Sequence, residues 1–173
     1  MRKIILAVFS LFSIAVDAQV ADNITFSSYV GTGLSMSTPS STPFLWQVMG
    51  HYNVNSHFAA GIGTGISVYE KTLVPLYADV KYNISKPHKF VPYVECGIGY
   101  GFAFDKNTNG GFYLSPSLGV QYTIGEKRKI LFSIGYELQE LERLKRYNDK
   151  YVNTEFQEHL SHSSICFKIG YAF

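Results

Sequence analysis

The chain has 173 residues, a formal net charge of +2 and a charged fraction of only 16%. Soluble domains usually contain about 25% charged residues. The near-neutral balance argues against a protein that binds nucleic acid through excess positive charge, so no nucleic-acid partner is expected. The 13 tyrosines and 13 phenylalanines favour β-strands.

The N-terminal segment has the features of a secretory signal peptide. Arg2 and Lys3 precede an apolar run over 4–16, which ends in the small-residue pattern Val16-Asp17-Ala18. This pattern predicts a signal peptide over residues 1–18, cleaved after Ala18. The alternative, a transmembrane anchor, needs about 20 apolar residues and the run is shorter. Residues 19–173 would then form the exported domain.

Eight segments of the remaining chain alternate between a bulky apolar row and a row of glycine, serine and a few polar residues. Alternation with a period of two predicts strands with two different faces. The last of them, "SICFKIGYAF", places Ile165 and Phe167 on one face and Lys168 on the other. The predicted strands cover residues 24–36, 44–54, 58–69, 74–84, 91–104, 112–124, 130–138 and 164–173.

Eight antiparallel strands fit either a soluble barrel with an apolar interior or a membrane barrel with an apolar exterior. Here the polar row has too few charges to face water, whereas the apolar row is bulky and nearly free of charge. Aromatic residues lie at both ends of that row, as lipid interfaces favour. The pattern therefore predicts an all-β, eight-stranded, antiparallel up-and-down transmembrane β-barrel. The two predicted girdles are Phe44, Trp46, Tyr100, Phe102, Phe104 and Phe112, and Tyr52, Phe58, Tyr82, Tyr122, Tyr171 and Phe173.

Several stretches resemble one family. With the signal peptide and eight strands, "PYVECGIGYGFAF", "GGFYLSPSLGVQYTIGEKRKILFSIGYEL" and the terminal "ICFKIGYAF" resemble the small outer-membrane β-barrels of the OmpX and OmpA-transmembrane-domain type. The resemblance implies the cell outer membrane, contact with its lipid and lipopolysaccharide, and recognition of the terminal strand, ending at Phe173, by the assembly machinery. It implies no cofactor and no particular function, because barrels of this type do not share one.

The inward row contains charged residues that can pair with one another. The turn between the fourth and fifth strands brings Glu95 opposite the region of Asp79 and Lys81, and Lys168 lies diagonally within reach of Glu137. Buried charges need partners, and eight strands enclose room for side chains rather than a channel. We therefore expect a salt-bridged plug, with a narrow pore as a further alternative. Cys96 and Cys166 lie on opposite faces and are expected to be separate thiols.

A second group carries possible chemistry. His159 and Ser161 would both face outward, and a His-x-Ser pair with a nearby glutamate resembles the site of the lipid A deacylase barrels, in which histidine activates serine. Glu140 or Glu158 would orient the histidine, although His162 stands where that family has asparagine. This lipid A-modifying enzyme is the alternative function. No metal site is expected, because His51, His57 and His88 are scattered.

The long segment 139–163 is the most promising interaction surface. Its pattern fits either a hairpin that continues the last two strands beyond the membrane or a short helix containing Leu138, Leu141 and Leu144. Either form would present an aromatic and basic patch to an extracellular protein or glycan. The first hypothesis is therefore a non-enzymatic structural or surface-interaction protein. The patch consists of Arg143, Tyr147, Tyr151 and Phe156.

Overall fold

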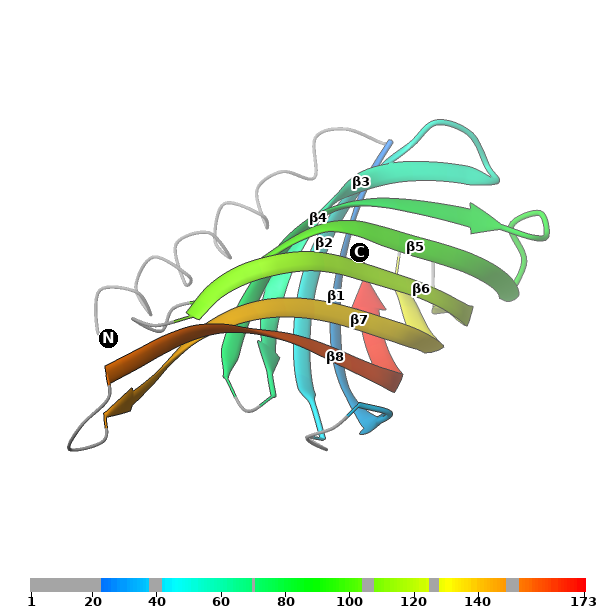
Figure 1. Ribbon diagram of the computed structural model, residues 1–173. Helices are drawn as coiled ribbons and strands as arrows, with labels where there is room; N and C mark the ends of the chain where they lie inside the picture. The colour runs from blue at the N-terminus through cyan, green and yellow to red at the C-terminus, as the bar shows by residue number, and fades with distance from the viewer. Residues whose placement is uncertain (1–22, 38–41, 70, 104–107, 125–127, 149–152) are drawn as a thin grey trace, which may run out of the picture.

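The computed structural model describes residues 23–37, 42–69, 71–103, 108–124, 128–148 and 153–173. Within them eight strands close into one antiparallel barrel, in which each strand pairs with its neighbours in sequence and β1 pairs with β8 (Figure 1). The predicted fold class is confirmed, whereas the predicted signal peptide lies outside the described residues. The strands are β1 (Ile24–Ser35), β2 (Phe44–Asn53), β3 (Phe58–Val68), β4 (Thr72–Asn83), β5 (Phe90–Ala103), β6 (Thr108–Ile124), β7 (Arg128–Asn148) and β8 (Asn153–Ala172).

The alternation in the sequence becomes an alternation of burial along each strand. In β5, exposed and buried positions follow one another almost without interruption. The exposed positions hold large apolar side chains such as Ile98, 52% exposed, while buried positions hold Tyr93 and Glu95. An exterior that is more apolar than the interior suits lipid rather than water as the surrounding solvent. Among the described residues, no helix is long and apolar enough to span a membrane.

The segment for which both a hairpin and a short helix were considered is a hairpin. Strands β7 and β8 pair without a register shift from Lys129 opposite Ala172 to Asn148 opposite Asn153. In Figure 1 strands β7 and β8, drawn in shades of orange, extend past the start of β6. A helix does not form because the apolar residues serve two faces of a strand: Leu141 is buried inside the barrel, whereas Leu138 lies in the outward row.

Strand β6 differs from its predicted range. It begins at Thr108 instead of at residue 112, and its register with β7 shifts between Gly110 and Tyr113. This irregularity is a β-bulge, which interrupts the strict alternation used to find the strand. The bulge lies beside Gly110 and Gly111.

The interior is packed in layers. One cluster contains four tyrosines near the middle of the barrel, and a second closes the end nearest the β7–β8 hairpin. Eight strands leave an interior that side chains can fill. The middle cluster is Tyr29, Met49, Tyr77, Tyr93, Tyr113, Leu131 and Ala172, and the end cluster is Tyr69, Leu73 and Leu141 with Ala103 and Leu160 packed against it.

Glycine is required where β5 approaches the backbone of β4 at Leu76 and Tyr77. A Cβ atom at Gly99, which lies in the inward row, would meet the backbone oxygen of Leu76 and would lie 2.5 Å from Tyr77 Cα. By contrast, a Cβ at the outward Gly50 would meet only Phe26 ring carbons, the nearest at 3.2 Å.

We expect Gly99→Ala to destabilise the barrel by about 1 to 3 kcal/mol, because strands β4 and β5 must move apart to accept the methyl group. The urea midpoint of the refolded protein in detergent micelles, followed by fluorescence of the single tryptophan, Trp46, measures this. The control Gly50→Ala makes the same chemical change facing outward and should leave the midpoint nearly unchanged. Equal midpoints for the two variants would contradict the close approach.

Candidate functional site

A polar network crosses the barrel interior around Glu137, which is fully buried. Its carboxylate accepts hydrogen bonds from Ser67 Oγ at 3.2 Å and Tyr69 OH at 3.1 Å on one oxygen. The other oxygen accepts from Tyr113 OH and from Gln47 Nε2, both at 3.3 Å. Donors from four other strands or loops thus converge on one carboxylate, which satisfies a buried negative charge.

Lys168 joins this network through an amide. Its ammonium donates to Gln47 Oε1 and to Ser115 Oγ, each at 3.1 Å. Gln47 therefore bridges the Lys168 ammonium and the Glu137 carboxylate, giving to one and accepting from the other. The residue that links the two predicted charges was not found from the sequence, although Gln47 stands in the inward row.

A second group of charges lies nearer the end of the barrel that holds the short turns. Lys81 is directly opposite Glu95 in the register of β4 and β5, and its ammonium lies 4.0 Å from the centre of the Tyr93 ring. The Glu95 carboxylate accepts a hydrogen bond from Tyr29 OH at 3.2 Å. Asp79 lies 2.7 Å from His51 Nε2. All five predicted interior residues, Asp79, Lys81, Glu95, Glu137 and Lys168, are buried.

His51 stands in the polar row of β2, but the sequence did not predict that it would meet Asp79 and Glu95. Ligand atoms of His51, Asp79 and Glu95 lie within 4.8 Å of one another, so these groups could together hold a metal ion. However, His51 and Asp79 already contact each other and Glu95 already accepts from Tyr29. The three groups thus have protein partners of their own, and Lys81 places a positive charge beside them. Together with Lys81 they form a buried polar group inside the barrel.

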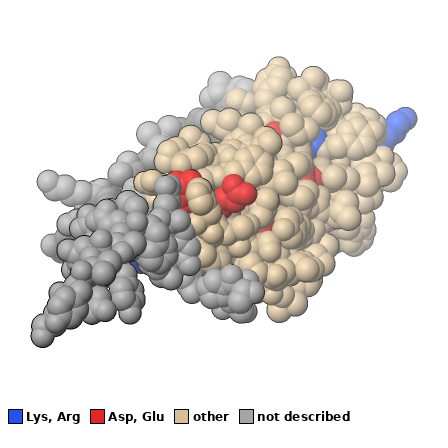
Figure 2. All heavy atoms as spheres, viewed as in Figure 1, with Lys and Arg blue, Asp and Glu red and all other residues tan. Residues whose placement is uncertain are grey.

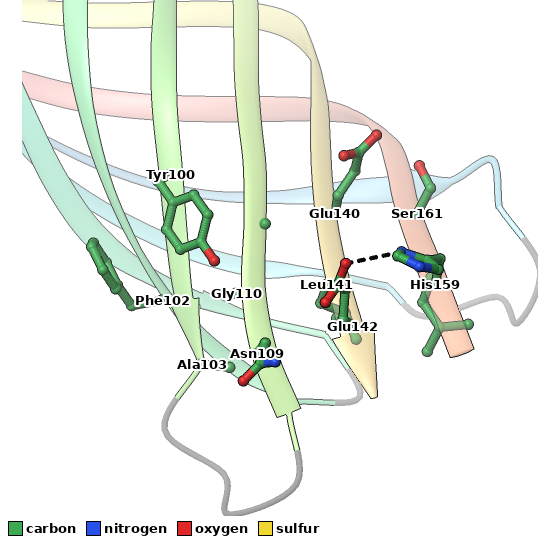
Figure 3. A pocket seen from close by; sticks show the side chains of 12 residues that line it. Tyr100, Phe102, Ala103, Asn109, Gly110, Glu140, Leu141, Glu142, His159 and Ser161 are labelled. Atoms are coloured by element: carbon green, nitrogen blue, oxygen red, sulfur yellow. Dashed lines mark ion pairs between the residues drawn. The ribbon is translucent and has the colours of Figure 1, made fainter. Parts of the chain in front are cut away.

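A hollow of about 600 Å³ opens on the outer wall at the hairpin end of β5 to β8, and its lining reaches Ala103, Leu141 and Leu160 of the end cluster. Figure 3 shows Tyr100 and Phe102 on one side and Glu140, Glu142, His159 and Ser161 on the other. Between these two sides β6 contributes Gly110 and Gly111, which have no side chains to fill the hollow. A Cβ at Gly111 would lie 2.5 Å from the Glu140 backbone oxygen, so this strip has no room for a side chain.

The register of β7 and β8 decides which acid meets the predicted histidine. Glu142 is opposite His159, and Glu140 is opposite Ser161. Glu142 Oε1 lies 3.2 Å from His159 Nδ1, drawn as the dashed line in Figure 3. The structure therefore brings Glu142, and not Glu140, to the imidazole. The side chain of Glu158 lies outside the described residues.

The predicted interaction patch is described only in its backbone. Arg143 and Tyr147 belong to β7 and Phe156 to β8, where Phe156 is opposite Lys145. Tyr151 lies outside the described residues, as do the side chains of the other three. The patch therefore stays a prediction. The two cysteines are free, Cys96 exposed and Cys166 buried, which confirms the prediction of separate thiols.

No protein-family model and no curated protein matches this sequence. Solved structures do match in fold. The outer membrane protein OprG from Pseudomonas aeruginosa is 10% identical with a TM-score of 0.63, over 86% of this chain and 93% of OprG. The outer membrane protein AlkL in lipid bilayers is 13% identical with a TM-score of 0.57, over 90% and 93%. Neisserial surface protein A is 13% identical with a TM-score of 0.54, over 86% and 96%.

These likenesses show the fold, since identities this low carry no function. The chain is an eight-stranded barrel of the outer-membrane type, and the predicted resemblance to the small outer-membrane barrels is confirmed at that level.

We expect Glu137→Ala to lower the free energy of unfolding by about 3 kcal/mol, because it leaves the Lys168 ammonium buried without the nearby carboxylate and removes the acceptor of four hydrogen bonds. The temperature at which the compact band is lost on an unboiled gel measures the effect. Glu140→Ala removes the same group from the exposed outer wall and serves as the control. An unchanged transition in Glu137→Ala would argue against a structural role for the network.

Proposed function

We propose that the protein is an integral outer-membrane barrel that acts as a non-enzymatic surface-interaction protein through its β7–β8 hairpin. The observation that carries this proposal is a mismatch in strand pairing. Strand β8 pairs with β7 out to Asn153, but its pairing with β1 ends at Ser164 opposite Ser35. Among the described strands, none pairs with the other edge of β8 beyond Ser163.

The open edge has a definite hydrogen-bonding polarity. Met36 N–H donates to the Ser163 carbonyl at 2.8 Å, so the backbone groups of Ser163 point toward β1. In a regular strand, successive residues direct their backbone groups to alternate sides. Residues 155, 157, 159 and 161 therefore direct theirs to the same edge, where the described chain supplies no strand. A segment extending from 153 to 162 spans roughly 30 Å.

Such an edge is suited to strand addition, in which an extended segment of a partner pairs through its backbone. Outside the membrane the edge faces water and is available to an extracellular protein. The barrel below it supplies a rigid base, because the interior is filled by the Glu137 network and by the apolar cluster of Tyr69, Leu73 and Leu141. That filling also supports a structural role over the alternative of a narrow pore.

A photoreactive residue in place of Thr154 should give one discrete protein adduct in intact cells. We expect Gln157→Pro to abolish this adduct, because proline removes an N–H from the open edge while it is tolerated in an edge strand. Gln157→Ala keeps the N–H and serves as the matched control. Persistence of the adduct in Gln157→Pro, or its equal loss in both variants, would contradict strand addition.

A second candidate function, hydrolysis of an acyl ester, is favoured by the contact between Glu142 and His159. A carboxylate at Nδ1 accepts the proton there and leaves Nε2 free to act as a base. Ser161 lies two residues further along the same outward row. Its Oγ would attack the ester carbonyl while His159 Nε2 takes the proton and returns it to the departing alcohol, and water would then release the acyl group.

One geometric step separates the structure from that arrangement. In Figure 3 the Ser161 hydroxyl points away from the His159 ring, so the serine must rotate about its Cα–Cβ bond before attack. A serine side chain has three staggered positions to choose from. The site lies on the outer wall, where a lipid with an ester-linked chain would reach it.

Incubation of the refolded barrel with lipopolysaccharide, followed by mass spectrometry of the lipid A, tests this second candidate. Loss of one acyl chain is the expected product. Ser161→Ala should reduce the rate by at least about 10³-fold, because removal of a nucleophile leaves only binding and polar contacts. Ser163→Ala, the next serine in the same row, should retain the rate. Lipid A of unchanged mass would eliminate hydrolysis of this substrate.

A further inference from the structure

We propose that the hollow on the outer wall binds the head group of a membrane lipid that carries an ammonium group. The hollow is lined by β5, β6, β7 and β8, and its volume of about 600 Å³ lies within the range of small-molecule sites. Binding requires no hydrolysis, so this inference is independent of the second candidate function.

The hollow lies where the wall changes from apolar to polar. The outward row of β7 is apolar from Ile130 to Leu138 and becomes acidic at Glu140 and Glu142. The outward row of β8 is apolar from Tyr171 to Ile165 and then continues with Ser163, Ser161 and His159. An occupant must match both parts. A lipid does so, because its chains can lie on the apolar rows while its head group enters the hollow.

The charge of the lining selects the kind of head group. Among the described residues that line the hollow there is no lysine or arginine, whereas Glu140 and Glu142 both contribute to it. The Glu142 carboxylate already contacts His159, with Oε1 3.2 Å from Nδ1. Glu140 makes no hydrogen bond or ion pair with another described side chain, and its register partner is Ser161. Carboxylates attract an ammonium group and repel anions, so a zwitterionic head group that ends in an ammonium is favoured over one whose only charge is negative.

The opposite wall supports the same choice. Tyr100 and Phe102 are 44% and 47% exposed and face the hollow from β5, with ring centres 5.1 Å apart in an edge-to-face arrangement. Aromatic faces attract ammonium groups. Figure 3 shows the rings and the carboxylates on opposite sides of the glycine strip, so one cation can lie between them.

The distribution of charge on the surface agrees with this placement. In Figure 2 the most prominent acidic atoms on the described part of this face lie toward the hairpin end. The hollow is therefore a local acidic feature on an otherwise apolar wall. A cation held there would neutralise the Glu140 carboxylate at the edge of the lipid.

Native mass spectrometry of the full barrel, released from detergent with added lipids, tests the proposal. Phosphatidylethanolamine and phosphatidylglycerol with identical chains differ in the head-group terminus, so the first should be retained preferentially, by roughly threefold to tenfold. The double variant Glu140→Gln, Glu142→Gln should lose that preference. Tyr100→Leu should weaken it, whereas Tyr82→Leu, a wall tyrosine at the other end with 50% exposure, should not.

Several outcomes would overturn the inference. Equal retention of the two phospholipids, or a preference of the wild-type protein for phosphatidylglycerol or for an uncharged glycolipid, would show that the ammonium is not recognised. Preference that survives the double glutamine variant would place recognition elsewhere. Folding of each variant is checked by its compact band on an unboiled gel. Hydrolysis would appear separately, as loss of acyl mass from the bound lipid.

Discussion

The pairing of β1 with β8 is the constraint on which the rest of the structure depends. Nine successive pairs, from Ser27 opposite Ala172 to Ser35 opposite Ser164, join the first strand to the last. In a hydrocarbon environment no water satisfies a free N–H or C=O group, so a sheet is stable there only when it has no edge. Closure leaves none of the eight strands with an unpaired edge in the membrane. It also fixes which row of each strand faces the interior and which faces the lipid.

Closure also imposes a problem of charge, because inward-facing groups have no water to meet. In this chain, neutral polar side chains form hydrogen bonds to the buried charged groups. Gln47 donates a hydrogen bond to Glu137 and accepts one from Lys168, so a single neutral amide connects two charged residues on strands β7 and β8. Tyrosine hydroxyls from β1 and β6 reach Glu95 and Glu137 in the same way. The interior is polar and yet closely packed.

Much of this architecture could be predicted from the alternation of apolar and polar residues with a period of two. The strands from 24 to 124 were located nearly to their ends, and Lys81 fell opposite Glu95 because a short turn fixes the register. Contacts across the barrel could not be found in this way. Gln47 meets Lys168 from β2, and such meetings depend on the tilt and stagger of the closed sheet, which no single strand encodes. The bulge at Gly110 broke the pattern in β6. The acid that meets His159 is Glu142 rather than Glu140 because the register of the long hairpin decides it.

The β7–β8 hairpin has a consequence for how the protein can vary. Past Arg143 on β7, where the pairing with β6 ends, the two strands pair only with each other among the described strands. The length of the hairpin is therefore independent of the pairing between β1 and β8 that closes the barrel. Insertion or deletion of one residue in either strand would turn every side chain beyond it to the opposite face. Viable insertions and deletions should therefore come in twos on each arm. Descendants of this chain can lengthen or shorten their outer ribbon in such steps while the membrane portion keeps its sequence.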